Sequence, residues 1–207
     1  MGSAYGLSRA ALHSFEAHHD LEHCAETLGV MSYSAASLGL SDVALDAARR
    51  CGDLRRPLMS TRIHALSGNY LGVASLWARD FEGSAAALDW AVTATQDSSR
   101  PHDRFQPLTN HCFSEMLAIT HARLENREVD LAPFLRLLAE SRRMALGGTV
   151  SGLSLGAQSI GMTLLVFLGA QALLFCDKPE EAREYIEACR ARARQLPPRS
   201  WLQALTP

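Results

Sequence analysis

One stretch of the chain, residues 69–91, constrains the fold more than any other part of the sequence. It reads as an apolar helix, a short turn and a second apolar helix. Its signature is a Leu-Gly pair, an aromatic residue, and then a small, a large and a small residue: Leu71, Gly72, Phe81, Ser84, Leu88 and Ala91. Because small side chains at this spacing let two antiparallel helices touch, the stretch predicts a helix-turn-helix unit.

This pattern resembles the tetratricopeptide repeat. The resemblance implies an all-α fold, with antiparallel helix pairs stacked as a superhelix, or α-solenoid. It also implies that the first helices of the pairs line a concave face that carries the ligand. The composition favours helix independently, since 31 Ala and 31 Leu stand against only 11 Val plus Ile.

Apolar periodicity predicts helices near 4–18, 21–38, 42–51, 55–78, 82–97, 108–126, 131–145, 153–176 and 180–195. Four prolines are expected just ahead of helices or in their first turns: Pro57, Pro107, Pro133 and Pro179. The predicted pairs lie near 21–51, 55–97, 108–145 and 153–195. Their second helices open near Asp42, Glu82, Leu131 and Glu180. Each of these spacings exceeds the roughly 34-residue family repeat, so the later units should have longer helices or connections.

Other copies of the signature are imperfect. The fourth pair has Leu168-Gly169, one extra residue in its turn, and then Ala182, Ile186 and Cys189. The first pair has Met31-Ser32 in place of Leu-Gly, followed by Ala44, Ala48 and Cys51. The third pair lacks the small-residue pattern. We therefore expect one repeat domain over 1–196 and a linker with the start of a further helix over 197–207, and an irregular helical bundle stays open as the alternative.

Charge and cysteine content exclude several classes of protein. Lys+Arg 20 against Asp+Glu 22 gives a net charge of −2, and the arginines are scattered, so no nucleic-acid partner is expected. Five irregularly spaced cysteines indicate reduced, mostly buried thiols in a cytoplasmic protein. The first residues lack a charged segment followed by an apolar one, so we do not expect them to be a secretory signal. Residues 160–176 are apolar but short and interrupted, so we expect a buried helix there and no membrane partner.

Three constellations are candidate chemical sites. His19 and His23, with Glu16, have the spacing of metal ligands on one helix, but Asp20 is a good helix N-cap and would place a turn between the two histidines. His111 and Glu115 could form an acid-base pair, although no nucleophile accompanies them. The glycine-rich segment 147–152 lacks a phosphate-loop signature and is expected to be a connection that could close over a ligand. Neither a metal nor a cofactor is expected.

Side chains of the predicted first helices are the candidate ligand contacts. The candidate groove residues are Arg62, Asn69, Val73, Leu76, Asn110, His111, Glu115, Gln158 and Gln171. Trp77, Trp90 and Tyr70 are expected mainly in the core. An apolar groove with a few polar residues suits a peptide or helix, so we expect a non-catalytic module that binds a protein or peptide segment.

The makeup of the chain is also similar to the helical segments of bacterial multidomain signalling proteins that precede a diguanylate cyclase or a DNA-binding output domain. That resemblance implies a sensory or regulatory role, with dimerisation through exposed apolar ends. Two alternatives remain open: a regulatory domain that binds a small-molecule effector in the groove, and a metal-dependent enzyme.

Overall fold

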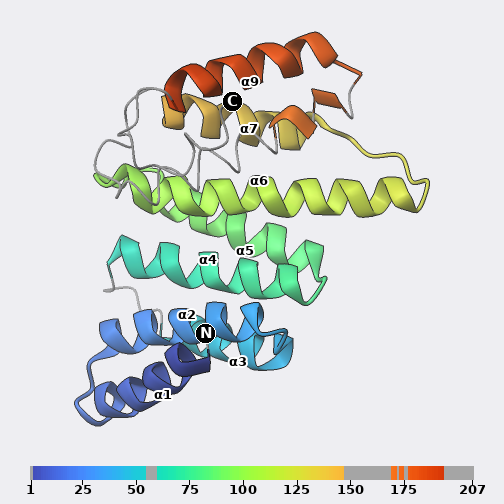
Figure 1. Cartoon of the computed structure of the whole chain (residues 1–207). Coiled ribbons are helices and arrows are strands. Elements are labelled where there is room, and N and C mark those ends of the chain that lie inside the picture. The colour runs from blue at the N-terminus through green and yellow to red at the C-terminus, as the bar shows by residue number, and fades with distance from the viewer. Residues whose placement is uncertain (1, 55–59, 147–168, 172, 175–176, 194–207) are drawn as a thin grey trace. The chain divides into compact units, whose positions relative to one another are not determined.

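The computed structural model describes residues 2–54, 60–146, 169–171, 173–174 and 177–193, and regular structure in those ranges is entirely α-helical (Figure 1). The helices are α1 (Gly2–Ala17), α2 (Leu21–Ser37), α3 (Ser41–Asp53), α4 (Thr61–Trp77), α5 (Phe81–Ala94), α6 (Pro101–Leu124), α7 (Ala132–Leu146) and α9 (Pro179–Ala193). The chain divides into two compact units, Met1–Ser114 and Glu115–Pro207. The all-α class is confirmed, and the α-solenoid arrangement stays a prediction.

The largest difference from the predicted helices is the start of α6. We expected the helix to begin at 108 with Pro107 ahead of it, but α6 begins at Pro101 and Pro107 lies inside it. Proline costs about 3 kcal/mol in a helix interior, because it lacks an N–H and crowds the preceding turn. Burial of Phe105, in the part of the helix that precedes Pro107, offsets this cost. Pro133 and Pro179 do lie in first turns, whereas Pro57 is outside the described residues.

The unit Met1–Ser114 contains a structural repeat. Helices α2 and α4 have 17 residues each and start at Leu21 and Thr61, while their partners α3 and α5 start at Ser41 and Phe81. The separation in sequence from Leu21 to Thr61 equals that from Ser41 to Phe81. The same separation leads from Thr61 to Pro101, where α6 starts. We call this alignment, in which Leu21 corresponds to Thr61, the repeat register.

The buried positions follow the same register. The buried residues of α3 coincide one by one with buried residues of α5: Ala44, Ala47, Ala48, Cys51 and Gly52 against Ser84, Ala87, Leu88, Ala91 and Val92. The two second helices therefore turn the same face toward the interior.

The wider spacing predicted after the second pair has a simple structural cause. Helix α6 has 24 residues, against 17 in α2 and α4. A connection over 125–131 then precedes α7. The expectation that later units have longer helices or longer connections is therefore met by this pair.

The short turns between helices share one backbone geometry. His19, Gly39 and Arg79 have φ values of 54°, 76° and 63°, in the left-handed region. The N–H of the next residue then donates to a carbonyl five positions earlier, as in Leu40 to Ala35 at 2.9 Å. This is the Schellman arrangement, which satisfies the last carbonyls of a helix and reverses the chain.

Two of these turns also carry a side-chain cap. The Asp20 and Asp80 carboxylates accept the backbone N–H of His23 and Gly83 at 3.2 and 2.9 Å. Each cap satisfies one of the first N–H groups of the following helix. The cap predicted at Asp20 is confirmed.

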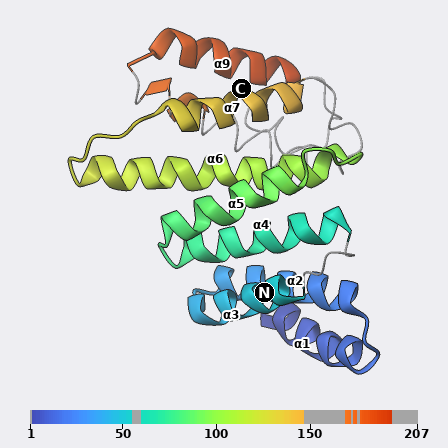
Figure 2. The ribbon, with the colours of Figure 1, turned by 180° about the vertical axis from the view of Figure 1, so that it is seen from behind.

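Successive helices of the first unit pack into layers, which Figures 1 and 2 show from two sides. Helix α4 contacts α5, α3 and α2, and α2 contacts α3 and α1. One apolar cluster joins the first four helices through buried residues that include Leu12, Leu28, Cys51 and Ile63. A second cluster consists of alanines of α2, α3 and α4. Helix α4 therefore lies between its own partner α5 and the preceding pair.

Small residues determine how closely these helices approach. A Cβ placed on Gly72 would lie 2.4 Å from Leu88 Cγ, and one on Gly68 would lie 2.6 Å from the Trp90 ring. In the first repeat the corresponding pairs are Ser32 with Ala48, and Leu28 with Arg50. In the first repeat, the large apolar residue at this position is Leu28 of the first helix, α2. In the second repeat it is Trp90 of the second helix, α5, which packs over Gly68.

In the second unit, Gly169 lies against the Tyr185 ring of α9, with the same separation in sequence as Gly72 and Leu88. Tyr185 is buried, whereas Ile186 is only half-buried. Tyr185, and not the predicted Ile186, therefore occupies the large position of this pair. The Cys189 side chain and the segment 153–168 lie outside the described residues.

We predict that substitutions at Gly72 and Leu88 are strongly coupled. Gly72→Ser should lower the free energy of unfolding by about 1–3 kcal/mol through overpacking, and Leu88→Ala by about 2–5 kcal/mol through a cavity. The double variant recreates the Ser-Ala pair of the first repeat, so it should lose clearly less than the sum. Urea denaturation followed by circular dichroism measures this.

Gly6→Ala is the control, since nothing lies within 4 Å of the added Cβ, and it should be neutral or stabilising by about 0.5–1 kcal/mol. Additive losses for Gly72→Ser and Leu88→Ala would show that the two residues do not share this contact.

Candidate functional site

Exposed apolar side chains lie on α2 and α4, the first helices of two successive pairs. Val30 and Tyr33 on α2 are 44% and 53% exposed, and Trp77 on α4 is 56% exposed. In the repeat register, Val30 corresponds to Tyr70, Tyr33 corresponds to Val73, and Trp77 corresponds to Ser37. These positions follow one face of each helix, spaced three or four residues apart.

Two polar contacts connect neighbouring first helices. Arg62 Nη2 on α4 lies 2.9 Å from Glu26 Oε1 on α2, and both side chains are partly exposed. Asn110 Nδ2 on α6 donates to Asn69 Oδ1 on α4 at 2.8 Å. We call the side chains of Glu26, Val30, Tyr33, Arg62, Tyr70 and Trp77 the first-helix surface.

Tyr70 connects α4 to α2 within this surface. A Cβ placed on Gly29 would overlap the Tyr70 ring, so the ring lies directly on the backbone of α2. Burial raises the pKa of Tyr70, and Cys51 and Glu26 raise it further while Arg62 opposes the shift. The phenol therefore stays protonated at neutral pH and acts as a fixed, uncharged part of the surface.

The predicted groove residues differ in their exposure. Arg62 is exposed, and Asn110, Glu115 and Gln171 are half-buried. Four others are buried and offer little area to a ligand: Asn69, Val73, Leu76 and His111. Gln158 lies outside the described residues. The structure brings Arg62, Asn69 and Asn110 onto adjoining helices, and it places Gln171 in the second unit.

Sequence reasoning missed Glu26, Val30 and Tyr33, and it favoured the core for Trp77, which is exposed. The signal that could have found them is the repeat register. It aligns Tyr33 with Val73 and Ser37 with Trp77, and so marks one face on both helices.

The histidines near the first turn do not share a helical face. Helix α1 ends at Ala17, and His19 has a positive φ before α2 begins. The His23 ring pairs with Asp20 at 2.8 Å and stacks on Phe15. Hydrogen bonds from the His23 backbone and side chain lower the pKa of Asp20. Within the described ranges, no group of three or more His, Cys, Asp or Glu residues could hold a metal ion.

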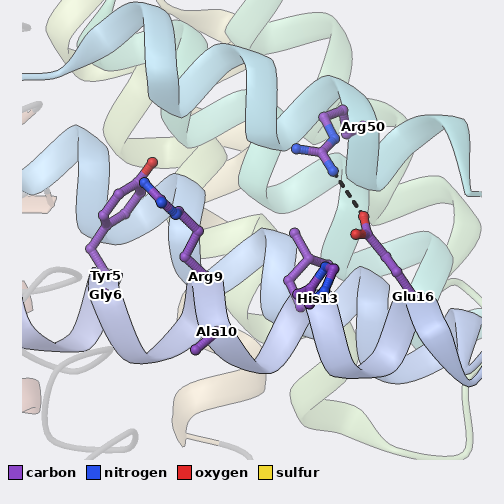
Figure 3. A pocket seen from close by; sticks show the side chains of 8 residues that line it. Tyr5, Gly6, Arg9, Ala10, His13, Glu16 and Arg50 are labelled. Carbon is purple, nitrogen blue, oxygen red and sulfur yellow. Dashed lines mark hydrogen bonds and ion pairs between the residues drawn. The ribbon is translucent and has the colours of Figure 1, made fainter.

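A cavity of about 630 Å³ lies between α1 and α3 (Figure 3). Its lining residues are Tyr5, Gly6, Arg9, Ala10, Leu12, His13, Glu16 and Arg50. Arg50 reaches from α3 and pairs with Glu16 of α1 at 2.9 Å. In the second unit a cavity of about 510 Å³ lies beside α7 and α9, where the Arg142 guanidinium is 4.9 Å above the Tyr185 ring.

Cys24, Cys51 and Cys112 are buried and form no disulfide bond within the described residues. No helix in the described part of the chain is long and apolar enough to cross a membrane. Most of the apolar stretch 160–176 lies outside that part.

We predict that the hydrogen bond between the Asn69 and Asn110 amides stabilises the fold. Asn69→Ala leaves a partly buried donor of Asn110 without its acceptor, which should lower the free energy of unfolding by about 1–3 kcal/mol. Gln106→Ala, at an exposed position of the same helix α6, should change it by less than about 0.5 kcal/mol. Equal effects of Asn69→Ala and Gln106→Ala in urea denaturation would contradict a role for this hydrogen bond.

Comparisons with known proteins assign neither a family nor a function to the chain. No family model, no curated protein and no solved structure shows a significant match to the chain.

Proposed function

We propose that the chain is a non-catalytic helical repeat module, whose pairs stack as an α-solenoid and bind a peptide segment of a partner protein along the first-helix surface. The observation that supports this most is the exposure of Val30, Tyr33 and Trp77 at corresponding faces of α2 and α4. Exposed apolar and aromatic side chains on one face are typical of protein interaction sites.

The surrounding polar groups define the chemistry of the occupant. The partly exposed Glu26–Arg62 pair offers one anionic and one cationic group beside the apolar positions. A segment with apolar side chains on one side and a charged group near them fits this combination. Tyr70 is held on Gly29, so this part of the surface is formed before the partner binds, which reduces the entropic cost of binding.

We also propose a regulatory or sensory role, including dimerisation, which rests only on the similarity of the sequence to helical segments of bacterial signalling proteins. Peptide binding has the additional support of the exposed side chains of the first-helix surface.

The test is a selection from a random peptide library against the full chain, followed by fluorescence polarisation with the selected peptides. Val30→Gln and Tyr33→Ala should each weaken binding by about tenfold or more, because anchors at the centre of an interface supply most of its energy. Val43→Gln is the matched control. Val43 is 38% exposed on α3, outside the first-helix surface, and its replacement should leave the affinity unchanged.

Failure to select any peptide would contradict the proposal. So would selected peptides that bind the Val30→Gln and Tyr33→Ala variants as tightly as the unaltered chain. Circular dichroism confirms that each variant keeps its helical content.

A further inference from the structure

The cavity between α1 and α3 gathers cationic side chains over an apolar floor. Tyr5, Arg9, His13 and Glu16 lie along one face of α1, at helical spacings of three and four residues (Figure 3). Arg50 reaches the cavity from α3. None of these residues belongs to the first-helix surface.

The repeat register explains why Arg50 is available to this cavity. At the corresponding position of α5 stands Trp90, whose ring fills the space over Gly68 of α4. In the first repeat the residue at the Gly68 position is Leu28, which is itself buried and fills that space from α2. Arg50 therefore extends toward α1 and pairs with Glu16.

The cavity carries a net positive charge. Arg9 and Arg50 contribute two positive charges and Glu16 one negative charge, which leaves one positive charge with His13 neutral. Arg50 contacts Glu16 through a single amino group, Nη2, so other donors of its guanidinium stay available. Arg9 has no ion-pair or hydrogen-bond partner among the described residues. A guanidinium without a carboxylate partner, in a cavity of net positive charge, favours an anion.

Apolar groups complete the site. Leu12, only 4% exposed, is part of the core, and the Tyr5 ring, Gly6 and Ala10 line the remainder of the cavity. A volume of about 630 Å³ falls in the range of small-molecule sites.

We propose that this cavity binds a small organic anion, with a carboxylate or phosphate group held by Arg9, with Arg50 adding to the positive charge of the same cavity, and with an apolar body on Tyr5 and Leu12. The ligand would contact α1 and α3 together, so its binding would stabilise their packing by mass action.

The test uses isothermal titration calorimetry of the full chain with phenyl phosphate, inorganic phosphate and phenol. Phenyl phosphate should bind saturably. Inorganic phosphate lacks the apolar ring and phenol lacks the phosphate group, so each should bind at least about tenfold more weakly. Raising the ionic strength should weaken the binding of phenyl phosphate.

Arg9→Gln should reduce the affinity for phenyl phosphate by about tenfold, through loss of a charge-assisted hydrogen bond. Arg49→Gln is the matched control, because Arg49 is exposed on the same helix as Arg50 but does not line the cavity. Circular dichroism should report unchanged folding for both variants.

Equal affinity of Arg9→Gln and the unaltered chain for phenyl phosphate would overturn the proposal, as would the absence of saturable binding. Inorganic phosphate that binds as tightly as phenyl phosphate would exclude the apolar part of the site. Binding of a glutamate-rich peptide without binding of phenyl phosphate would assign the cavity to an acidic protein segment instead.

Discussion

The close approach of helices at small residues is the constraint on which the first unit depends. Gly72 lets α4 lie against Leu88 of α5, and Gly29 lets α2 lie against Tyr70 of α4. The first contact closes a helix pair, and the second joins one pair to the next. A Cβ at either glycine would require the facing side chain to move, and well-packed interiors resist such movement.

These contacts also determine which side chains reach the surface. In the second repeat, Trp90 packs over Gly68. In the first repeat Leu28 takes the place of Gly68, and Arg50, which corresponds to Trp90, extends to Glu16 of α1 instead. Tyr33 is exposed where its counterpart Val73 is buried. The two repeats therefore share a backbone arrangement while their exchanged residues create different surfaces.

Much of the helical layout follows from the sequence because its signals are local. The Asp20 cap, the first-turn prolines at 133 and 179, and the contact of Gly72 with Leu88 each depend on residues close in the chain. The predicted start of α6 was wrong because burial of Phe105, a tertiary effect, outweighs the local preference of Pro107.

The candidate site was harder to predict, since exposure depends on which helices cover a residue. Val73 and Leu76 fall on a first helix, as expected, but α4 lies among α2, α3 and α5, so both are buried. Glu26 and Tyr33 were missed because the first pair matches the repeat signature weakly. The α1–α3 cavity is lined by Arg9 of α1 and Arg50 of α3, and no local pattern predicts that these two helices share a cavity.

The contacts at Gly72 and Gly29 can be measured directly by nuclear Overhauser spectroscopy on the isotopically labelled full chain. Close packing at these glycines should give cross-peaks from the Gly72 α-protons to the Leu88 methyl groups, and from the Gly29 α-protons to the Tyr70 ring. Assigned resonances for all four residues without these cross-peaks would contradict the close packing of α4 on α5 and of α2 on α4.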